Sequence, residues 1–130
     1  MSTIYRQVDA NADQKSVTVD TVLTKSDTGK SILLDAVGEA ITLPEPEEGL
    51  HYKFLVTADV ITTPWVVTAT GAIVYGSVTE AGLVQLASAE TALTVVHTNS
   101  IRGDWFTLES DGTNWYLGGQ FSVAGSFTTA

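Results

Sequence analysis

The sequence contains no cysteine and few cations. Without cysteine the chain has no disulfide, no thiolate zinc site and no cysteine nucleophile, and its redox compartment stays open. Six Lys and Arg stand against 15 Asp and Glu, a net charge of −9, and the six cations are spread along the sequence without forming a patch. Nucleic-acid and lipid-surface binding both need clustered cations. We therefore expect neither a nucleic acid nor a membrane as a partner.

Long hydrophobic runs are also missing. No apolar run approaches the roughly 20 residues of a membrane span, and the first residues, MSTIYRQVDANAD, hold no apolar segment of a secretory signal. We expect a soluble protein made in a cytoplasm. The 130 residues suit one domain, and only 16% of them are charged, against about 25% in typical soluble domains.

What is present is a strand pattern, because apolar residues recur with period two and the recurring types are Val, Thr, Ile and aromatics. In residues 50–57, Leu50, Tyr52, Phe54 and Val56 share one face, and Leu55 is the one apolar residue on the other. Further strands are predicted at residues 16–23, 31–35, 40–43, 65–70, 72–75, 82–86, 91–98, 104–109 and 114–117. Turn signals arrive about every ten residues, so the pattern predicts an all-β fold, an antiparallel β-sandwich or small β-barrel (jelly-roll or β-tulip-like) of about 8–10 short strands with little or no helix.

Two segments need a separate interpretation. Residues 79–91 are rich in Ala, Glu and Leu and could form a helix, but Gly82 interrupts the run and no N-cap precedes it, so strand is favoured. In residues 104–119 two aromatic-bearing strands flank a turn in which Gly112 can take a positive φ, which predicts a hairpin. At least one Trp of this hairpin should pack in the core beside Phe106 or Leu108.

Motifs for ligand binding are incomplete. Residues 24–31, TKSDTGKS, end like a phosphate-binding loop, but Thr24 stands where its first glycine belongs and a strand follows Ser31, so a polar β-turn is favoured. Residues 9–20 place Asp9, Asn11 and Asp13 at calcium-loop spacing, yet Gln14 replaces the required glycine. A flexible, solvated N-terminal segment is the favoured interpretation there, with weak cation binding as the alternative.

The remaining candidates for catalytic or metal-binding residues do not indicate an enzyme. Glu45, Glu47 and Glu48 lie in a proline-rich turn where water keeps them ionised. His51 and His97 are 46 positions apart and lack a ligand or nucleophile signature. We therefore expect no catalytic residue, no cofactor and no metal site.

The aromatic residues leave one binding hypothesis open. Three Trp, with Tyr52, Tyr75 and Tyr116, could form a platform for sugars, although core packing is the more common role for such residues. Trp115 is the best candidate for a platform.

Several short motifs, in their order along the chain, resemble the motifs of a known class of proteins. The runs 23–24 (LT), 27–35 (DTGKSILLD), 40–44 (AITLP), 49–54 (GLHYKF), 103–105 (GDW) and 111–116 (DGTNWY) resemble a pattern common in small structural proteins of tailed bacteriophages, in particular capsid decoration, or cement, proteins. The resemblance covers about residues 20–119. It implies an all-β domain that assembles, usually as a homotrimer, on the outside of the phage head and bridges subunits of the major capsid protein.

On this interpretation the protein is a non-enzymatic virion component on the capsid exterior, synthesised in the host bacterial cytoplasm. Residues 1–15 would be a flexible N-terminal arm, residues 16–121 a single β domain and residues 122–130 a C-terminal tail, with either end able to reach a neighbouring subunit. The alternative is a receptor- or carbohydrate-binding module of a tail fibre or tip.

Overall fold

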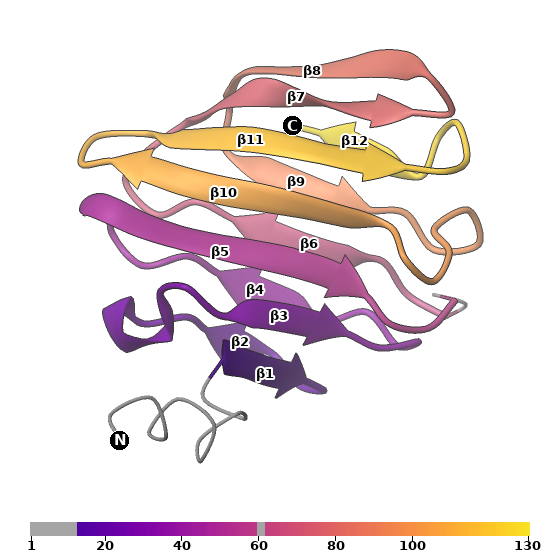
Figure 1. The fold of residues 1–130 in the computed structure, drawn as a ribbon, viewed down its shortest axis with the longest axis horizontal. Coiled ribbons are helices and arrows are strands. Elements are labelled where there is room, and N and C mark those ends of the chain that lie inside the picture. Colours follow the sequence, from indigo (N-terminus) through magenta and orange to yellow (C-terminus); the bar gives the residue numbers. More distant parts are fainter. Residues whose placement is uncertain (1–12, 60–61) are drawn as a thin grey trace, which may run out of the picture.

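The computed structural model describes residues 13–59 and 62–130, and this part of the chain is nearly all β. Two mixed sheets pack face to face as a sandwich, with the seven-stranded sheet in front in Figure 1 and the five-stranded sheet, fainter, behind it. The seven-stranded sheet runs in the order β1 (Gln14–Val17), β3 (Ser31–Leu34), β5 (Glu48–Val56), β10 (Trp105–Asp111), β11 (Trp115–Phe121), β7 (Val74–Glu80) and β8 (Leu83–Glu90). The five-stranded sheet runs β12 (Phe127–Thr129), β9 (Ala92–Val95), β6 (Trp65–Thr68), β4 (Ala40–Thr42) and β2 (Thr21–Val22). This confirms the predicted all-β sandwich.

The first six strands alternate between the two sheets. β1, β3 and β5 pair in parallel in the larger sheet, and β2, β4 and β6 pair in parallel in the smaller one. The chain therefore winds as a flattened coil from β1 to β6. From β7 onward it forms the hairpins β7–β8 and β10–β11, whose strands pair antiparallel. The twelve strands of the described residues thus exceed the expected 8–10, and the sheets are mixed rather than purely antiparallel.

The core lies between the sheets and is built largely from aromatic rings. Phe54 and Phe106 are cross-strand partners whose rings stack 4.6 Å apart. Phe127, from β12 of the other sheet, lies 5.3 Å from the Phe106 ring. Trp65 and Trp115 are fully buried, which confirms that at least one hairpin Trp belongs to the core. Aromatic pairs of this kind add about 0.5–1.5 kcal/mol each to the burial of their surface.

The strongest local predictions are confirmed. β5 alternates as expected, with Leu50, Tyr52, Phe54 and Val56 buried and Leu55 half-buried on the opposite face. The predicted hairpin is β10–β11, and Gly112 has a φ of +100° in its turn. The helix considered for residues 79–91 does not form, because Ala81 and Gly82 both take positive φ and reverse the chain between β7 and β8.

Two strand predictions were wrong. Residues 16–23 are not one strand: β1 ends at Val17 and β2 begins at Thr21, because the chain crosses there from one sheet to the other. A single strand over residues 16–23 would place Val17, Val19 and Leu23 on one inward face. Val17 and Leu23 are buried, but Val19 is 63% exposed. The strand expected at residues 72–75 instead runs from Val74 to Glu80.

The C-terminal tail also needs correction. Residues 127–129 form β12, which pairs with β9, and Phe127 is fully buried. The backbone N–H of Phe127 donates to Oε2 of the buried Glu80 at 2.8 Å. The end of the chain is therefore part of the sandwich and does not project as an arm. The predicted N-terminal arm falls mostly on residues 1–12, outside the described residues.

Candidate functional site

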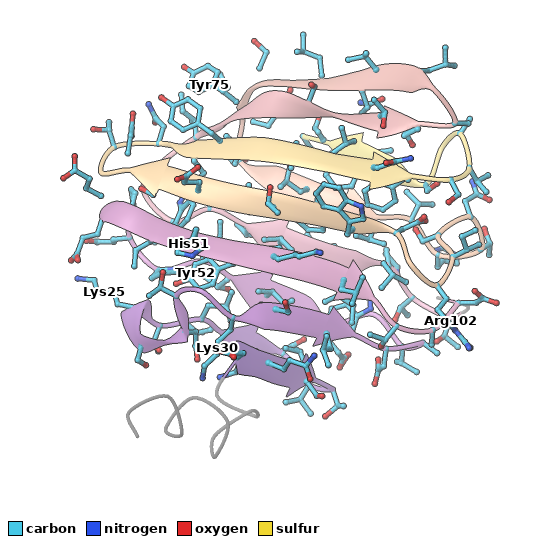
Figure 2. All side chains as sticks on the ribbon, viewed as in Figure 1. Lys25, Lys30, His51, Tyr52, Tyr75 and Arg102 are labelled. Atoms are coloured by element: carbon cyan, nitrogen blue, oxygen red, sulfur yellow. The ribbon has the colours of Figure 1, made fainter. Side chains whose placement is uncertain are left out.

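The outer face of the larger sheet carries a row of four side chains from four neighbouring strands. His51 of β5 is the cross-strand partner of Glu109 of β10, Glu109 is the partner of Tyr116 of β11, and Tyr116 is the partner of Tyr75 of β7. Figure 2 shows His51 and Tyr75 toward the same end of this sheet. Because residues paired across a sheet point to the same side, the row combines an imidazole, a carboxylate and two phenol rings on one surface.

A cavity of about 350 Å³ lies at the His51 end of this row. Its polar walls are Lys30, His51, Lys53, Thr107 and Glu109. The turn before β3 borders it, since the Gly29 N–H donates to the His51 carbonyl at 2.8 Å. The cavity thus offers hydrogen-bond donors and one carboxylate, which suits a small polar ligand.

The two tyrosines at the other end of the row form a stacked pair. Their ring centroids are 6.3 Å apart and the rings are inclined by 24°. Tyr116 is 44% exposed, and its Oη donates to Oδ2 of Asp111 at 2.9 Å. The backbone N–H groups of Asn114 and Thr113, together with this hydroxyl, lower the pKa of Asp111, and the same hydrogen bond raises the pKa of Tyr116. The Tyr116 ring is held in place by a group of its own hairpin.

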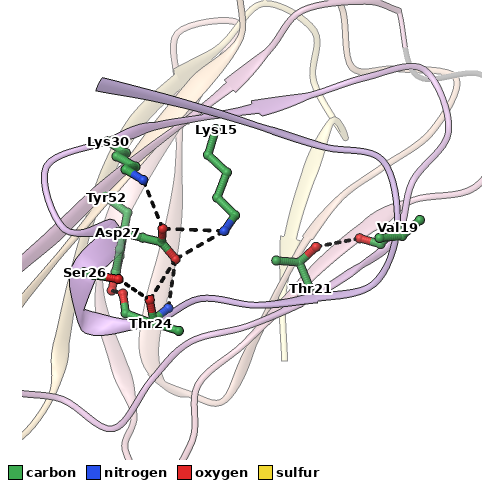
Figure 3. Close-up of polar contacts among 8 residues, drawn as sticks. All are labelled: Lys15, Val19, Thr21, Thr24, Ser26, Asp27, Lys30 and Tyr52. Atoms are coloured by element: carbon green, nitrogen blue, oxygen red, sulfur yellow. Dashed lines mark hydrogen bonds and ion pairs between the residues drawn. The ribbon is translucent and has the colours of Figure 1, made fainter. Parts of the chain in front are cut away.

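A second polar cluster surrounds Asp27 (Figure 3). Asp27 ends the short 3-10 helix η2 (Lys25–Asp27), and its buried carboxylate accepts the Thr24 backbone N–H at 3.0 Å. Lys30 and Lys15 lie 3.3 and 3.5 Å from its oxygens. Burial opposes ionisation, but these hydrogen bonds and charges outweigh it and lower the pKa of Asp27.

This cluster changes the interpretation of two sequence motifs. A turn at Thr28 and Gly29 follows η2, and β3 begins at Ser31. Lys30 contacts Asp27, so the structure supports the polar turn rather than a phosphate loop. The topology also brings Lys15 and Lys30 onto one carboxylate, although the six cations make no patch in the sequence.

The histidines do not form a common site. His51 is exposed near the start of β5, and its Nδ1 lies 3.0 Å from the Gly49 carbonyl. His97 follows β9, whose end lies at the opposite end of the sandwich from the start of β5 (Figure 1). Glu45, Glu47 and Glu48 are exposed as predicted, and Glu47 forms an ion pair with Lys25.

No metal site is evident in the described part of the chain. Residues 13–59 and 62–130 contain no group of three or more His, Asp or Glu placed to hold a metal ion. Of the calcium-loop candidates, Asp9 and Asn11 lie outside the described residues. Asp13 is exposed, and the residues after it form β1, so the described half of the proposed loop is strand rather than a wrapped ion-binding loop.

Trp115 is not a ligand platform, because it is fully buried and its ring lies 5.9 Å from that of Tyr52. The aromatic surface of the outer face is provided instead by the exposed Tyr116 and by the half-buried Tyr75 and Trp105. The sequence contained a signal for Tyr116, since in the alternating hairpin it points opposite to Trp115. It contained none for the Tyr75–Tyr116 contact, which depends on the parallel pairing of β7 with β11.

Exposed aliphatic side chains concentrate at the sheet edges. Leu83, Val84 and Leu86 on β8 are 68%, 70% and 62% exposed. Val22 on β2, at one edge of the smaller sheet, is 65% exposed. Exposed apolar clusters of this kind mark protein contact surfaces.

Comparison of the chain with protein-family models, curated proteins and solved structures found no match. Among the described residues, no helix has the length and apolar character needed to span a membrane.

Proposed function

We propose that the protein is a structural, non-enzymatic component of a tailed-phage particle: a decoration protein that binds the outside of the head as a homotrimer and bridges major capsid subunits. The observation that carries the proposal is the placement of its exposed aliphatic residues. Leu83, Val84 and Leu86 lie on the edge strand β8 of the larger sheet, and Val22 lies on the edge strand β2 of the smaller sheet, where other subunits of an assembly can reach them, whether copies of this chain or capsid protein. The resemblance of residues 20–119 to cement proteins indicates that this assembly is a decorated phage head.

The proposed mechanism is stabilisation by mass action. A protein that binds only the assembled shell lowers the free energy of that shell relative to its ruptured state. Sparse charge at the contact surface limits the cost of removing it from water. We propose that the residues before β1 add a contact to a neighbouring capsid subunit.

The test uses heads of the phage that encodes this chain, prepared without it. Purified protein should bind them saturably, in multiples of three, and raise their melting temperature. A chain lacking residues 1–12 is the matched variant: lower occupancy supports the N-terminal contact, and unchanged occupancy removes it. Absence of saturable binding by the full chain would reject the decoration role.

A second candidate function is supported by the tyrosine pair. A receptor- or carbohydrate-binding module of a tail fibre needs an exposed aromatic surface beside polar groups, and Tyr116 and Tyr75 lie in one row with Glu109 and His51. On this candidate the protein binds host cells and ignores heads. Tyr116→Ala should then abolish cell binding, whereas Val22→Ala, on the other sheet, should leave it unchanged.

A further inference from the structure

The edge strand β8 has few of the features that keep sheet edges from pairing. It pairs with β7 on one side, and no other described strand pairs with it. Exposed edges are usually protected by charged residues, prolines or short strands. β8 has eight residues, LVQLASAE, in which Glu90 at the end is the one charged residue. Its three large aliphatic side chains, Leu83, Val84 and Leu86, are each more than 60% exposed.

The register with β7 identifies which backbone groups are free. Glu80 and Leu83 close a two-residue turn and form a hydrogen-bonded pair, so hydrogen-bonded pairing to β7 recurs at Gln85 and Ala87. The N–H and C=O groups of Val84 and Leu86 therefore point away from β7. Consistent with this, Thr129 Oγ1 donates to the Leu86 carbonyl at 3.4 Å. This carbonyl oxygen retains a second lone pair for another donor.

We propose that the free edge of β8 pairs antiparallel with β8 of a second copy, about a two-fold axis at Gln85. In this register Val84 of each copy is opposite Leu86 of the other, and both pairs are hydrogen-bonded through their outward backbone groups. Val84 and Leu86 of the two copies then cover one another on the outer face of a continuous fourteen-stranded sheet, twice the seven strands of one copy.

The β8 edge is a place where a second copy can approach without direct charge repulsion. Each copy carries a net charge of −9, so two copies can approach closely only where the surface is uncharged. Residues 81–89 form such a surface, since they contain no ionisable side chain. Glu80, on the neighbouring strand, is buried and faces the sandwich interior. The pairing does not depend on the capsid proposal, because it follows from the edge strand alone.

The absence of cysteine allows a direct test of the axis. In the proposed register, residue 85 of one copy faces residue 85 of the other in a non-hydrogen-bonded pair, with Cβ atoms about 4.5–5.5 Å apart. Gln85→Cys should therefore oxidise to a covalent dimer. Val22→Cys, which places the thiol at an exposed edge residue of the other sheet, should still associate through β8 but remain largely free of covalent crosslinks at the same concentration.

A second measurement tests the interface without oxidation. Sedimentation and native mass at roughly 0.1 mM, well above a micromolar dissociation constant, should show an even number of copies: a dimer, or a hexamer if a three-fold contact is also present. Leu86→Lys should weaken the association at least tenfold, whereas Val22→Lys should leave it unchanged. Melting of the monomer should be similar in both variants, because both side chains are exposed.

Three results would overturn the pairing: a monomer at this concentration, a trimer, or equal crosslinking of Gln85→Cys and Val22→Cys. Failure of the pairing remains distinct from failure of the decoration role. If the protein does not pair through β8 but binds heads saturably, the capsid proposal stands and the pairing is rejected. If the protein pairs but does not bind heads, the pairing stands and the capsid proposal is rejected.

Discussion

Asp27 connects three separate segments of the fold, and its replacement by alanine should be among the most damaging single changes at a polar residue. Its side chain is 5% exposed and accepts the backbone N–H of Thr24. Lys15 reaches it from β1, and Lys30 reaches it from the residue before β3. One carboxylate therefore joins the 3-10 helix η2 to two parallel strands at the edge of the larger sheet.

The expected loss follows from these contacts. A hydrogen bond from the Thr24 amide to a charged acceptor contributes about 1.5–3 kcal/mol. Each lysine is partly exposed, so each ion pair adds only roughly 0.5 kcal/mol. Asp27→Ala should therefore lower the free energy of unfolding by about 2.5–4 kcal/mol. Asp27→Asn keeps an oxygen that can accept the Thr24 N–H, so its free energy of unfolding should fall by about half as much.

The effect should depend on pH in a defined direction. The pKa of Asp27 is lowered in the folded protein from its ordinary value of 3.8, so folding favours the ionised carboxylate. Its stabilisation is complete above this ordinary value and is lost as the pH falls through the lower folded pKa. The stability difference between the wild type and Asp27→Asn should therefore be constant near neutral pH and shrink in acid.

Urea unfolding followed by tryptophan fluorescence measures this difference, because Trp65 and Trp115 are fully buried and become exposed on unfolding. Asp20→Ala is the matched control, since Asp20 is exposed and accepts one backbone N–H, from Ala40. Equal losses for Asp27→Ala and Asp20→Ala would refute the reasoning. So would a difference between wild type and Asp27→Asn that grows as the pH falls.

Three further changes test the interior. Glu80→Ala removes the acceptor of the buried Phe127 N–H, so it should lower the free energy of unfolding by about 1–3 kcal/mol. It should also speed hydrogen exchange of the Phe127 amide. Gly119→Ala would place a Cβ 2.7 Å from Cα of Phe106. Thermal unfolding should therefore show a free energy of unfolding lower by about 1–3 kcal/mol or more. Tyr52→Phe removes the hydrogen bond that the Tyr52 hydroxyl donates to the Thr24 carbonyl at 2.8 Å, and should lower the free energy of unfolding by about 1 kcal/mol. Burial raises the pKa of Tyr52 to about 12, so wild-type stability should fall between pH 10, the ordinary tyrosine value, and pH 12, and the variant should lose less over this range.

Each change has a matched comparison. Glu80→Gln keeps an acceptor oxygen and should preserve slow exchange; exchange as fast as in the alanine variant would contradict the role of that oxygen. Gly118→Ala adds a Cβ at an ordinary 3.6 Å from Thr107 Oγ1 and should be tolerated. If the wild type and Tyr52→Phe lose the same stability between pH 10 and pH 12, a group other than Tyr52 causes that loss.

The parts of the fold predicted from the sequence are those set by local pattern. β5 was predicted because its side chains alternate without interruption between a buried and an exposed face. The β10–β11 hairpin was predicted because Gly112 supplies the positive φ of its turn. Both features depend on residues close together in the chain, where period and turn chemistry carry the information.

The parts that were missed depend on contacts between distant residues. Phe127 lies in a polar segment, and its burial depends on the acceptor that Glu80 supplies from 47 positions away. β7 contains Gly76 and Ser77 at its centre and has no clear alternation, yet it pairs on both sides, with β11 and β8. The cavity depends on the pairing of β5 with β3 and β10, and the tyrosine pair depends on the pairing of β7 with β11. Local propensity does not encode such registers.

Pairing through β8 would restrict the positions on the capsid at which the protein can bind. A dimer related by a two-fold axis presents two identical docking surfaces, and both can make the same contacts only where the shell also has a two-fold or quasi-two-fold axis. A homotrimer makes the corresponding demand at a three-fold axis. Cryo-electron microscopy of decorated heads should therefore show trimers at three-fold positions joined across neighbouring two-fold positions by paired β8 strands, if the pairing is maintained on the particle. Density confined to three-fold positions, with β8 away from every other copy, would overturn the pairing and leave the decoration role intact.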